Sequence, residues 1–351
     1  MENQMEQVEL TAPMMQEQPV KETKEKRGIS GSTIKLIAII SMLIDHIGAA
    51  ILARMLIVRG LLDISMTNDL EKQMAWLAQN GTLLNVMQIM RTIGRLGFPI
   101  FCFLLVEGFQ KTRNVKKYIF RLTIFAIISE VPFDLAFSGT FFAIGYQNVF
   151  FTLLIGMAAL CAFDFLKRQE LSKKTRVLLS AGGILLLPGY FALFMCDNWA
   201  GGFVLQFFAI CYAIFFVLTI AVCVLYRLRK GADKAWGLCV NLAPLAVNML
   251  LAHFLHTDYA GIGVLTIAAM YAFREKKVKS MLAGCIALAG MCLLFLDISE
   301  IPAFFALIPV AFYNGKRGLK MKYFFYAFYP VHLLLLWLIA LATGMGWVSL
   351  M

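Results

Sequence analysis

Apolar segments long enough to cross a lipid bilayer recur along almost the whole chain from about residue 34. They are runs of roughly 17–25 residues, the length of helix that spans the hydrocarbon core. The chain has 351 residues, 60% of them hydrophobic, whereas soluble domains are roughly 45–50% apolar. A transmembrane barrel would show short segments of alternating hydrophobicity instead. The sequence therefore predicts an all-α, polytopic membrane helical bundle.

The predicted membrane domain covers residues 34–342, with about ten or eleven transmembrane helices and a cytoplasmic N-terminus. Residues 1–33 are polar and predict a disordered cytoplasmic tail. The eight cysteines fall mostly inside apolar runs without ligand spacing, so we expect small buried side chains and no metal site. The predicted spans are 34–57, 83–109, 118–138, 141–165, 177–195, 202–226, 236–254, 259–273, 280–297, 301–314 and 323–342.

Lysine and arginine residues mark alternate loops between the predicted spans. The stretch Lys21–Lys35 and five loops hold 27 of the 32 basic residues. Basic loops stay in the cytoplasm, so this pattern places the N-terminus inside and the C-terminus outside. It also accounts for the net charge of +11 without nucleic acid as a partner. The expected location is a bacterial cytoplasmic membrane, with the lipid bilayer as the first partner.

Several polar and ionisable residues lie within the predicted spans, where each one costs several kcal/mol unless it faces a partner or a wet cavity. Arg91 and Arg95 are four residues apart and therefore share one helix face. We expect Asp45, Glu130 or an anionic ligand to neutralise them. The residues predicted to line one polar cavity are Asp45, His46, Arg91, Arg95, Glu130, Asn148 and His332. The alternative is that each is a structural salt bridge or hydrogen bond.

Two chemistries suit such a cavity, and the residues alone leave both open. In an enzyme, His46 acts as a general base or a transient acyl carrier, Asp45 holds its tautomer, and the arginines bind phosphates or an oxyanion. In a transporter or flippase of an anionic small molecule, the same groups relay protons and bind the substrate at the midplane. A non-catalytic assembly factor is the third reading.

The motifs IDHIG, GRLGFPIF, EGFQKTR, NVFFTLLIG, DYAGIGVL and YPVHLLLL together resemble the TraX family of bacterial membrane proteins. The resemblance extends from about residue 33 to 340. One departure is Ala260, at a position where the family pattern has glycine. The resemblance implies N-acetylation of a pilin in the founding member. More broadly, it implies a membrane acyltransferase that uses acetyl-CoA or another acyl-CoA as cosubstrate. The implied acceptor is a pilin, peptide, glycan or cell-wall component at the outer face.

The resemblance also implies roles for individual residues. His46 is the expected catalytic base or acyl carrier, Asp45 orients it, and Arg95 acts beside them on the donor or the transition state. The residues expected to bind substrate are Arg91, Glu130, Asn148, Thr152 and His332. The residues expected to bind the acyl-CoA, at the cytoplasmic end of the second span, are Glu107, Arg113, Lys116 and Lys117.

Overall fold

The computed structural model describes residues 27–294, 297–320 and 322–350. These residues form a helical bundle with no β-strand among them, so the all-α class predicted from the sequence is confirmed. Most of the predicted tail, residues 1–33, lies outside the described residues. The first helix begins three residues earlier than predicted, at Gly31, because the Ser30 side chain caps it by accepting a hydrogen bond from the Thr33 backbone amide.

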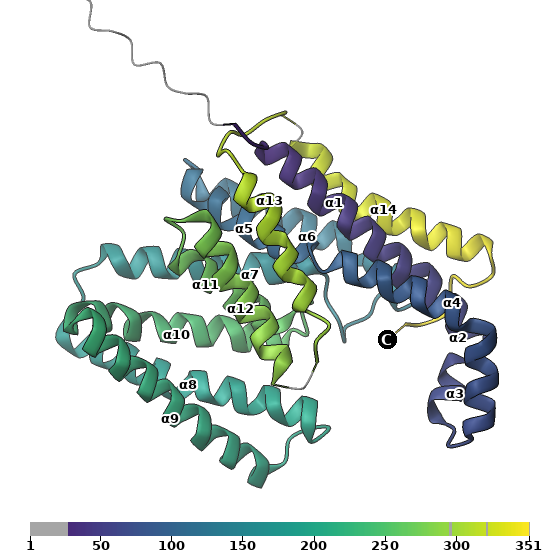
Figure 1. Cartoon of the computed structure of the whole chain (residues 1–351). Coiled ribbons are helices and arrows are strands. Elements are labelled where there is room, and N and C mark those ends of the chain that lie inside the picture. Colours follow the sequence, from purple (N-terminus) through teal and green to yellow (C-terminus); the bar gives the residue numbers. More distant parts are fainter. Residues whose placement is uncertain (1–26, 295–296, 321, 351) are drawn as a thin grey trace, which may run out of the picture.

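The helices follow one another in the order shown in Figure 1. They are α1 (Gly31–Ile47), the π-helix η1 (Gly48–Leu52), α2 (Ala53–Val58), α3 (Leu61–Met66), α4 (Leu70–Gly94), α5 (Gly97–Lys111), α6 (Val115–Phe137), α7 (Val149–Arg168), α8 (Lys173–Trp199), α9 (Leu205–Lys230), α10 (Ala232–Phe254), α11 (Ala260–Ala272), α12 (Lys277–Leu293), the 3-10 helix η2 (Ile301–Ala306), α13 (Leu307–Phe312) and α14 (Lys322–Ala342).

Seven helical segments in the described part of the chain are long and apolar enough to cross a membrane. Two are composite, Gly31–Val58 and Leu70–Lys111, and the others are α7, α8, α9, α10 and α14. The remaining predicted spans coincide with α6, which carries more charged residues, and with the shorter helices α11, α12 and η2–α13. The chain is therefore a multi-pass helical membrane protein, as the sequence predicted.

Two segments differ from the prediction. Residues 58–82, which lie between the first two predicted spans and so were expected to form a long loop, form α3 and the first half of α4, which project from the bundle in Figure 1. The fourth span begins at Val149 rather than at residue 141. The residues before it include exposed Phe141, Phe142 and Ile144, and an apolar loop of this kind cannot be told from a helix by hydropathy alone.

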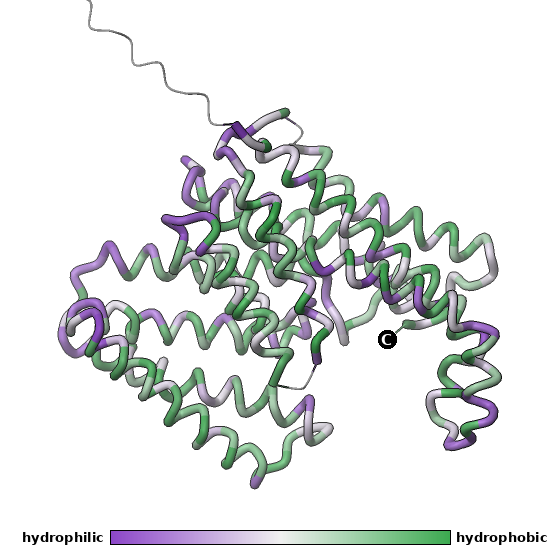
Figure 2. Tube along the Cα trace, viewed as in Figure 1, coloured by the Kyte–Doolittle hydropathy of each residue, from purple (hydrophilic) through white to green (hydrophobic). Residues whose placement is uncertain are grey.

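The basic loops gather along one side of the bundle. The connections α5–α6, α7–α8, α9–α10, α11–α12 and α13–α14 lie along the same edge in Figure 1, and the first four are clearly hydrophilic in Figure 2. We call this edge the basic face. The connections α6–α7, α8–α9 and α10–α11 lie on the opposite side.

The helices fall into a central group and a peripheral layer. α1 packs on α4, α5 and α14, while α5 and α11 pack against each other and each of them packs on α7 and α12. The layer of α8, α9 and α10 joins this group through the contacts of α10 with α7 and α11. α8 approaches α10 very closely at Gly183, where a Cβ would overlap the backbone of Ala243, as small residues permit between membrane helices.

A fully buried arginine ties three distant parts of the chain together. The Arg54 guanidinium donates hydrogen bonds to the backbone carbonyls of Ala50 (3.0 Å) and Leu135 (3.0 Å). Its Nε donates to the carbonyl of Val348 at 2.9 Å. The sequence analysis did not single out Arg54, although it lies within the first predicted span. Its charge is tolerated because five donors on a planar fork can serve several carbonyls at once.

Replacing Arg54 with methionine keeps the apolar stem and removes all three hydrogen bonds. Each buried carbonyl left unsatisfied costs about 1–3 kcal/mol, so we expect a clear drop in the thermal unfolding temperature in detergent. Arg59→Met is the matched control, because the Arg59 side chain is exposed and, within the described part of the chain, hydrogen-bonds only the Asn80 side chain, at 3.2 Å. Equal unfolding temperatures for the two variants would contradict this account of Arg54.

Candidate functional site

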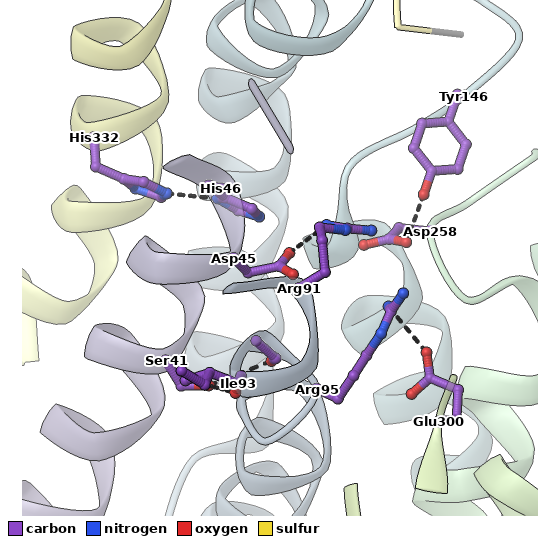
Figure 3. Close-up of polar contacts among 11 residues, drawn as sticks. Ser41, Asp45, His46, Arg91, Ile93, Arg95, Tyr146, Asp258, Glu300 and His332 are labelled. Carbon is purple, nitrogen blue, oxygen red and sulfur yellow. Dashed lines mark hydrogen bonds and ion pairs between the residues drawn. The ribbon is translucent and has the colours of Figure 1, made fainter. Parts of the chain in front are cut away.

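The candidate site is built around the end of α1, where Asp45 and His46 precede the π-helix η1. Short π-helical segments are rare and occur frequently at functional sites. Successive helix residues point about 100° apart, so the Asp45 and His46 side chains leave α1 in different directions. Figure 3 shows the consequence: His46 faces α14, and Asp45 faces α4.

His46 forms a hydrogen-bonded pair with His332 of α14. The His46 Nδ1 lies 2.7 Å from the His332 Nε2, and the two rings are nearly parallel, at 4°. His332 is 4% exposed. Both histidines were predicted to line one polar cavity, and the structure brings them into direct contact across 286 residues of chain.

The partners of His332 define where the protons lie. Its Nδ1 is 2.7 Å from the Phe328 carbonyl oxygen, which can only accept a hydrogen bond. In the neutral ring Nδ1 therefore carries the proton and Nε2 accepts from His46. His46 must then carry its proton on Nδ1, which leaves the lone pair on its Nε2. The pair thus presents one unprotonated ring nitrogen with a fixed tautomer.

Asp45 binds Arg91 rather than His46. The two side chains form an ion pair at 2.7 Å that is partly exposed, at 15% for Asp45 and 32% for Arg91. The expectation that Asp45 neutralises an arginine agrees with this geometry. The expected contact between Asp45 and the His46 ring is absent from the hydrogen bonds of the described residues, and His332 makes that contact instead.

Arg95 has a partner that the sequence analysis missed. It pairs at 2.9 Å with Glu300, whose side chain is 7% exposed and which directly precedes η2. Glu300 lies between two predicted spans and so was not counted among the intramembrane groups. A carboxylate beside an apolar segment, facing an otherwise unmatched arginine in another span, was the signal available.

The remaining predicted residues form two further contacts. The Asn148 side chain donates to the Ala126 carbonyl at 2.8 Å and to the Glu130 carboxylate, joining α7 to α6. Thr152 donates to the backbone carbonyl of Asp258. Glu130 therefore binds Asn148 and forms no ion pair with an arginine of the described residues. Neither contact includes a hydrogen bond to the histidine pair among the described residues.

Asp258 belongs to the same charged cluster as the arginines. It accepts a hydrogen bond from Tyr146 at 2.6 Å and lies within electrostatic reach of both Arg91 and Arg95. Figure 3 shows Arg91 between Asp45 and Asp258. The turn that holds Asp258 is unusual, because Tyr259 and Ala260 have left-handed backbones with φ of 61° and 41°. The Ala260 conformation explains why glycine suits this position in the family pattern.

The break between α4 and α5 sets the two arginines beside α1. α4 ends at Gly94 and α5 begins at Gly97, within the motif GRLGFPIF. The Ser41 hydroxyl contacts the freed carbonyl of Ile93 at 2.6 Å and that of Gly94 at 3.3 Å. Backbone breaks at membrane depth are tolerated where the protein satisfies the freed groups in this way.

A cavity of about 510 Å³ opens near the basic face and leads toward the histidine pair. Four basic side chains and no acidic one line it among the described residues, namely Lys35, Lys111, Arg121 and Arg317. Its deeper wall is largely apolar and aromatic, and includes Met42, Leu104, Phe150, Leu153 and Tyr329. The volume lies in the usual range of small-molecule sites.

The inner end of the cavity approaches the histidine pair, although neither histidine is part of its described lining. Met42 is one turn before His46 on α1, about 6 Å along the axis. The Tyr329 ring lies 6.0 Å from the His46 ring and 5.7 Å from the His332 ring, measured between centroids. Tyr329 therefore separates the cavity from the histidine pair.

The residues predicted to bind the acyl-CoA do not line this cavity. Arg113, Lys116 and Lys117 are exposed in the α5–α6 region, outside the lining. Glu107 accepts hydrogen bonds from Lys111 (2.8 Å) and from the Tyr313 hydroxyl (2.7 Å). The prediction chose the densest basic run, whereas the lining comes from single basic residues on α1, α5, α6 and the α13–α14 connection.

Comparison with known proteins gives one family. The family model described as TraX protein matches residues 30–212 and 204–340. A probable fimbrial assembly protein FimC, serogroup H1, from Dichelobacter nodosus is 28% identical over 260 residues. That alignment covers 71% of this chain and 82% of the relative. No solved structure matches the chain.

The close approach of α1 and α4 generates a prediction. A Cβ on Gly94 would overlap the Asp45 side chain, so Gly94→Ala must displace Asp45 and weaken its pairing with Arg91. We expect a lower thermal unfolding temperature in detergent. Gly81→Ala on the same helix is the control, since its Cβ would meet Leu77 at an ordinary 3.6 Å. A Gly94→Ala protein as stable as the Gly81→Ala protein would refute the close packing.

Proposed function

The chain belongs to the TraX family, and we propose that it is an integral membrane acyltransferase. In this proposal it takes an acyl group, in the simplest case acetyl, from acyl-CoA at the cytoplasmic side of the bacterial cytoplasmic membrane. It delivers that group to an amine or hydroxyl at the outer face. The single observation that carries the proposal is the cavity that runs from basic side chains to the wall beside His46.

The composition of this cavity suits the two ends of an acyl-CoA. The phosphates of CoA carry negative charge, and Lys35, Arg121 and Arg317 supply positive charge without a competing carboxylate in the lining. The pantetheine arm and acyl group are much less polar, in keeping with a wall that includes Met42 and Phe150. Lys35 and His46 are eleven residues apart on α1, about 16 Å along the helix. A donor held at its phosphates would extend toward Tyr329.

The histidine pair supplies a base for the transfer step. The acceptor nitrogen or oxygen attacks the thioester carbon, forms the new acyl bond and displaces the CoA sulfur. His46 Nε2 takes the proton from the acceptor and returns it to the sulfur, which leaves as the thiol. His332 holds the His46 ring and stabilises its charged form. An acyl-histidine intermediate at the same nitrogen is the alternative route.

The proposed acceptor follows from the relative's name and the transfer chemistry, not from the cavity. The relative's printed name refers to fimbrial assembly, so a fimbrial or pilin subunit is the first acceptor to test. A peptide, glycan or cell-wall amine follows from the same chemistry. The Asp45–Arg91 pair is partly exposed, which makes it the candidate to receive an acceptor from the side away from the cavity.

A transporter of an anionic molecule is the alternative function. That reading requires Arg91 and Arg95 to be free to bind an anion at the midplane. Both are paired with carboxylates, Asp45 and Glu300, in this structure. The pairing leaves neither arginine free for an anion at the midplane, whereas the proposed enzyme binds its donor in the cavity lined by Lys35, Arg121 and Arg317 and does not need Arg91 or Arg95 for that step.

The first test uses purified protein in detergent with acetyl-CoA. We expect wild type and His46→Ala to bind acetyl-CoA alike, and the variant to lose at least about 100-fold in turnover, the usual contribution of a positioned base. His332→Asn should reduce turnover less. It should also change the pH dependence, because the orienting contact is altered while the base remains. Binding is measured by calorimetry and turnover by release of free thiol.

Full turnover by His46→Ala would exclude the assignment of the base. Absence of acetyl-CoA binding by both proteins would exclude the donor, and uptake of small anions into proteoliposomes would then be measured.

A second test compares two sets of basic residues. Arg121→Gln/Arg317→Gln removes two charges from the cavity lining, and Arg113→Gln/Lys117→Gln removes two exposed charges nearby. We expect the first double variant to raise the KM for acetyl-CoA about tenfold, equivalent to about 1.4 kcal/mol of binding, with little change for the second. A raised KM for Arg113→Gln/Lys117→Gln alone would instead support the sequence-based prediction that the α5–α6 loop binds the acyl-CoA.

A further inference from the structure

A second cavity of about 450 Å³ lies at the basic face between α7, α8, α10 and α11. It shares no lining residue with the cavity beside the histidine pair. Neither the family comparison nor the proposed acyl transfer assigns it a role. Since the sequence places the basic face in the cytoplasm, this cavity lies where the headgroups of the cytoplasmic leaflet meet the helix ends.

Three basic side chains from three separate segments line this cavity. They are Lys167 at the end of α7, Arg176 in the first turn of α8 and Arg274 after α11. None of the three forms an ion pair with a carboxylate among the residues that the structure describes. Asp233 is the one acidic residue in the described lining. The excess of positive charge favours an anion.

The orientation of Arg274 is fixed before any ligand arrives. Its guanidinium lies 3.9 Å above the Tyr271 ring and donates to the Tyr271 backbone carbonyl at 2.7 Å. Trp236 lines the same cavity and is 39% exposed. Tryptophan and tyrosine are enriched where a membrane meets water. The presence of Tyr271 and Trp236 in the lining therefore favours a ligand from the membrane surface over one from the bulk solution.

Asn241 adds a requirement that a phosphate alone does not meet. Its Nδ2 donates to the Gly237 carbonyl at 2.9 Å, and this contact defines which side-chain atom is the oxygen. The Oδ1 is buried and has no hydrogen-bond partner in the described part of the chain. An orphaned acceptor calls for a donor, which a phosphate diester lacks and a headgroup hydroxyl supplies.

We propose that this cavity binds an anionic phospholipid of the cytoplasmic leaflet through its phosphate, with a hydroxyl of the headgroup donating to Asn241. Phosphatidylglycerol has this chemistry. Basic pockets between membrane helices on the cytoplasmic side bind anionic headgroups in this manner. Because the lining comes from both the peripheral layer and the central group, the bound lipid would clamp α8 and α10 to α7 and α11.

The test measures thermal unfolding in detergent micelles titrated with phosphatidylglycerol or phosphatidylcholine. We expect phosphatidylglycerol to raise the unfolding temperature of wild type, since a ligand that binds only the folded state stabilises it. For Arg176→Gln/Arg274→Gln the half-saturating lipid concentration should rise at least about tenfold. Arg227→Gln/Arg229→Gln removes the same charge from the end of α9, outside the cavity, and should behave as wild type.

Each variant is compared with and without lipid, so a change in its own stability does not obscure the result. Equal half-saturation for all three proteins would overturn the proposal in favour of a general surface effect. Stabilisation by glycerol 3-phosphate or ADP, lost in the cavity variant while phosphatidylglycerol has no effect, would overturn it in favour of a soluble ligand.

A separate comparison tests the proposed contact between the headgroup hydroxyl and Asn241. Phosphatidylmethanol carries the same charge without a headgroup hydroxyl. Wild type should bind phosphatidylglycerol more tightly than phosphatidylmethanol, and Asn241→Leu should bind the two equally. Equal binding by wild type would overturn the role of Asn241.

Discussion

The pairing of charged side chains inside an apolar bundle is the constraint on which the rest of this structure depends. A charge in hydrocarbon costs several kcal/mol unless a partner is provided. Here α1 brings Asp45 to Arg91, the segment before η2 brings Glu300 to Arg95, and Arg54 is satisfied by carbonyls alone. Apart from the bond of Arg54 to Ala50, one turn away, each contact joins parts of the chain that are distant in sequence. The polar groups therefore hold the helices in register at the site.

The histidine pair follows from the same arrangement. With Asp45 committed to Arg91 on one side of α1, His46 faces α14, where His332 accepts its hydrogen bond. The Phe328 carbonyl fixes the far end of this chain of donors and acceptors. The result is an imidazole with a defined tautomer, separated from the cavity by the Tyr329 ring, and neither histidine would have this property alone. In the proposed reaction, the Asp45–Arg91 ion pair and the proton-transferring histidine pair are therefore separate groups on two sides of α1.

Much of this organisation was predictable from the sequence. Hydropathy and basic loops gave the spans, because lipid imposes length and charge rules on each segment separately. The polar residues of the site were found by the same logic, since Asp45, His46, Arg91, Arg95 and His332 stand out in apolar runs. The sequence could not give their pairing, which depends on helix rotation and contacts across the chain. Glu300 and Arg54 were missed for different reasons.

Glu300 lies between spans, where an acidic residue is unremarkable until the fold brings it to Arg95. Arg54 lies near the end of the first predicted span, where a basic residue is usually taken to mark the end of the membrane helix. The lining of the cavity beside the histidine pair could not be predicted either, because it combines a few residues from each of α1, α5, α6, α7 and α14. The predicted acyl-CoA site followed the density of basic residues along the sequence, which is high in the α5–α6 loop. Packing of the helices instead brings Arg121 and Arg317 into the cavity lining.

The central claim is that acyl-CoA enters the cavity from the basic face and presents its thioester beside His46. The most direct measurement is an experimental structure of the protein in a membrane mimic with a non-reactive thioether analogue of acetyl-CoA. The account predicts the phosphates near Lys35, Arg121 and Arg317, and the sulfur against Tyr329, within one helical turn of His46. An analogue bound outside this cavity, or bound with its sulfur at the basic face, would contradict it.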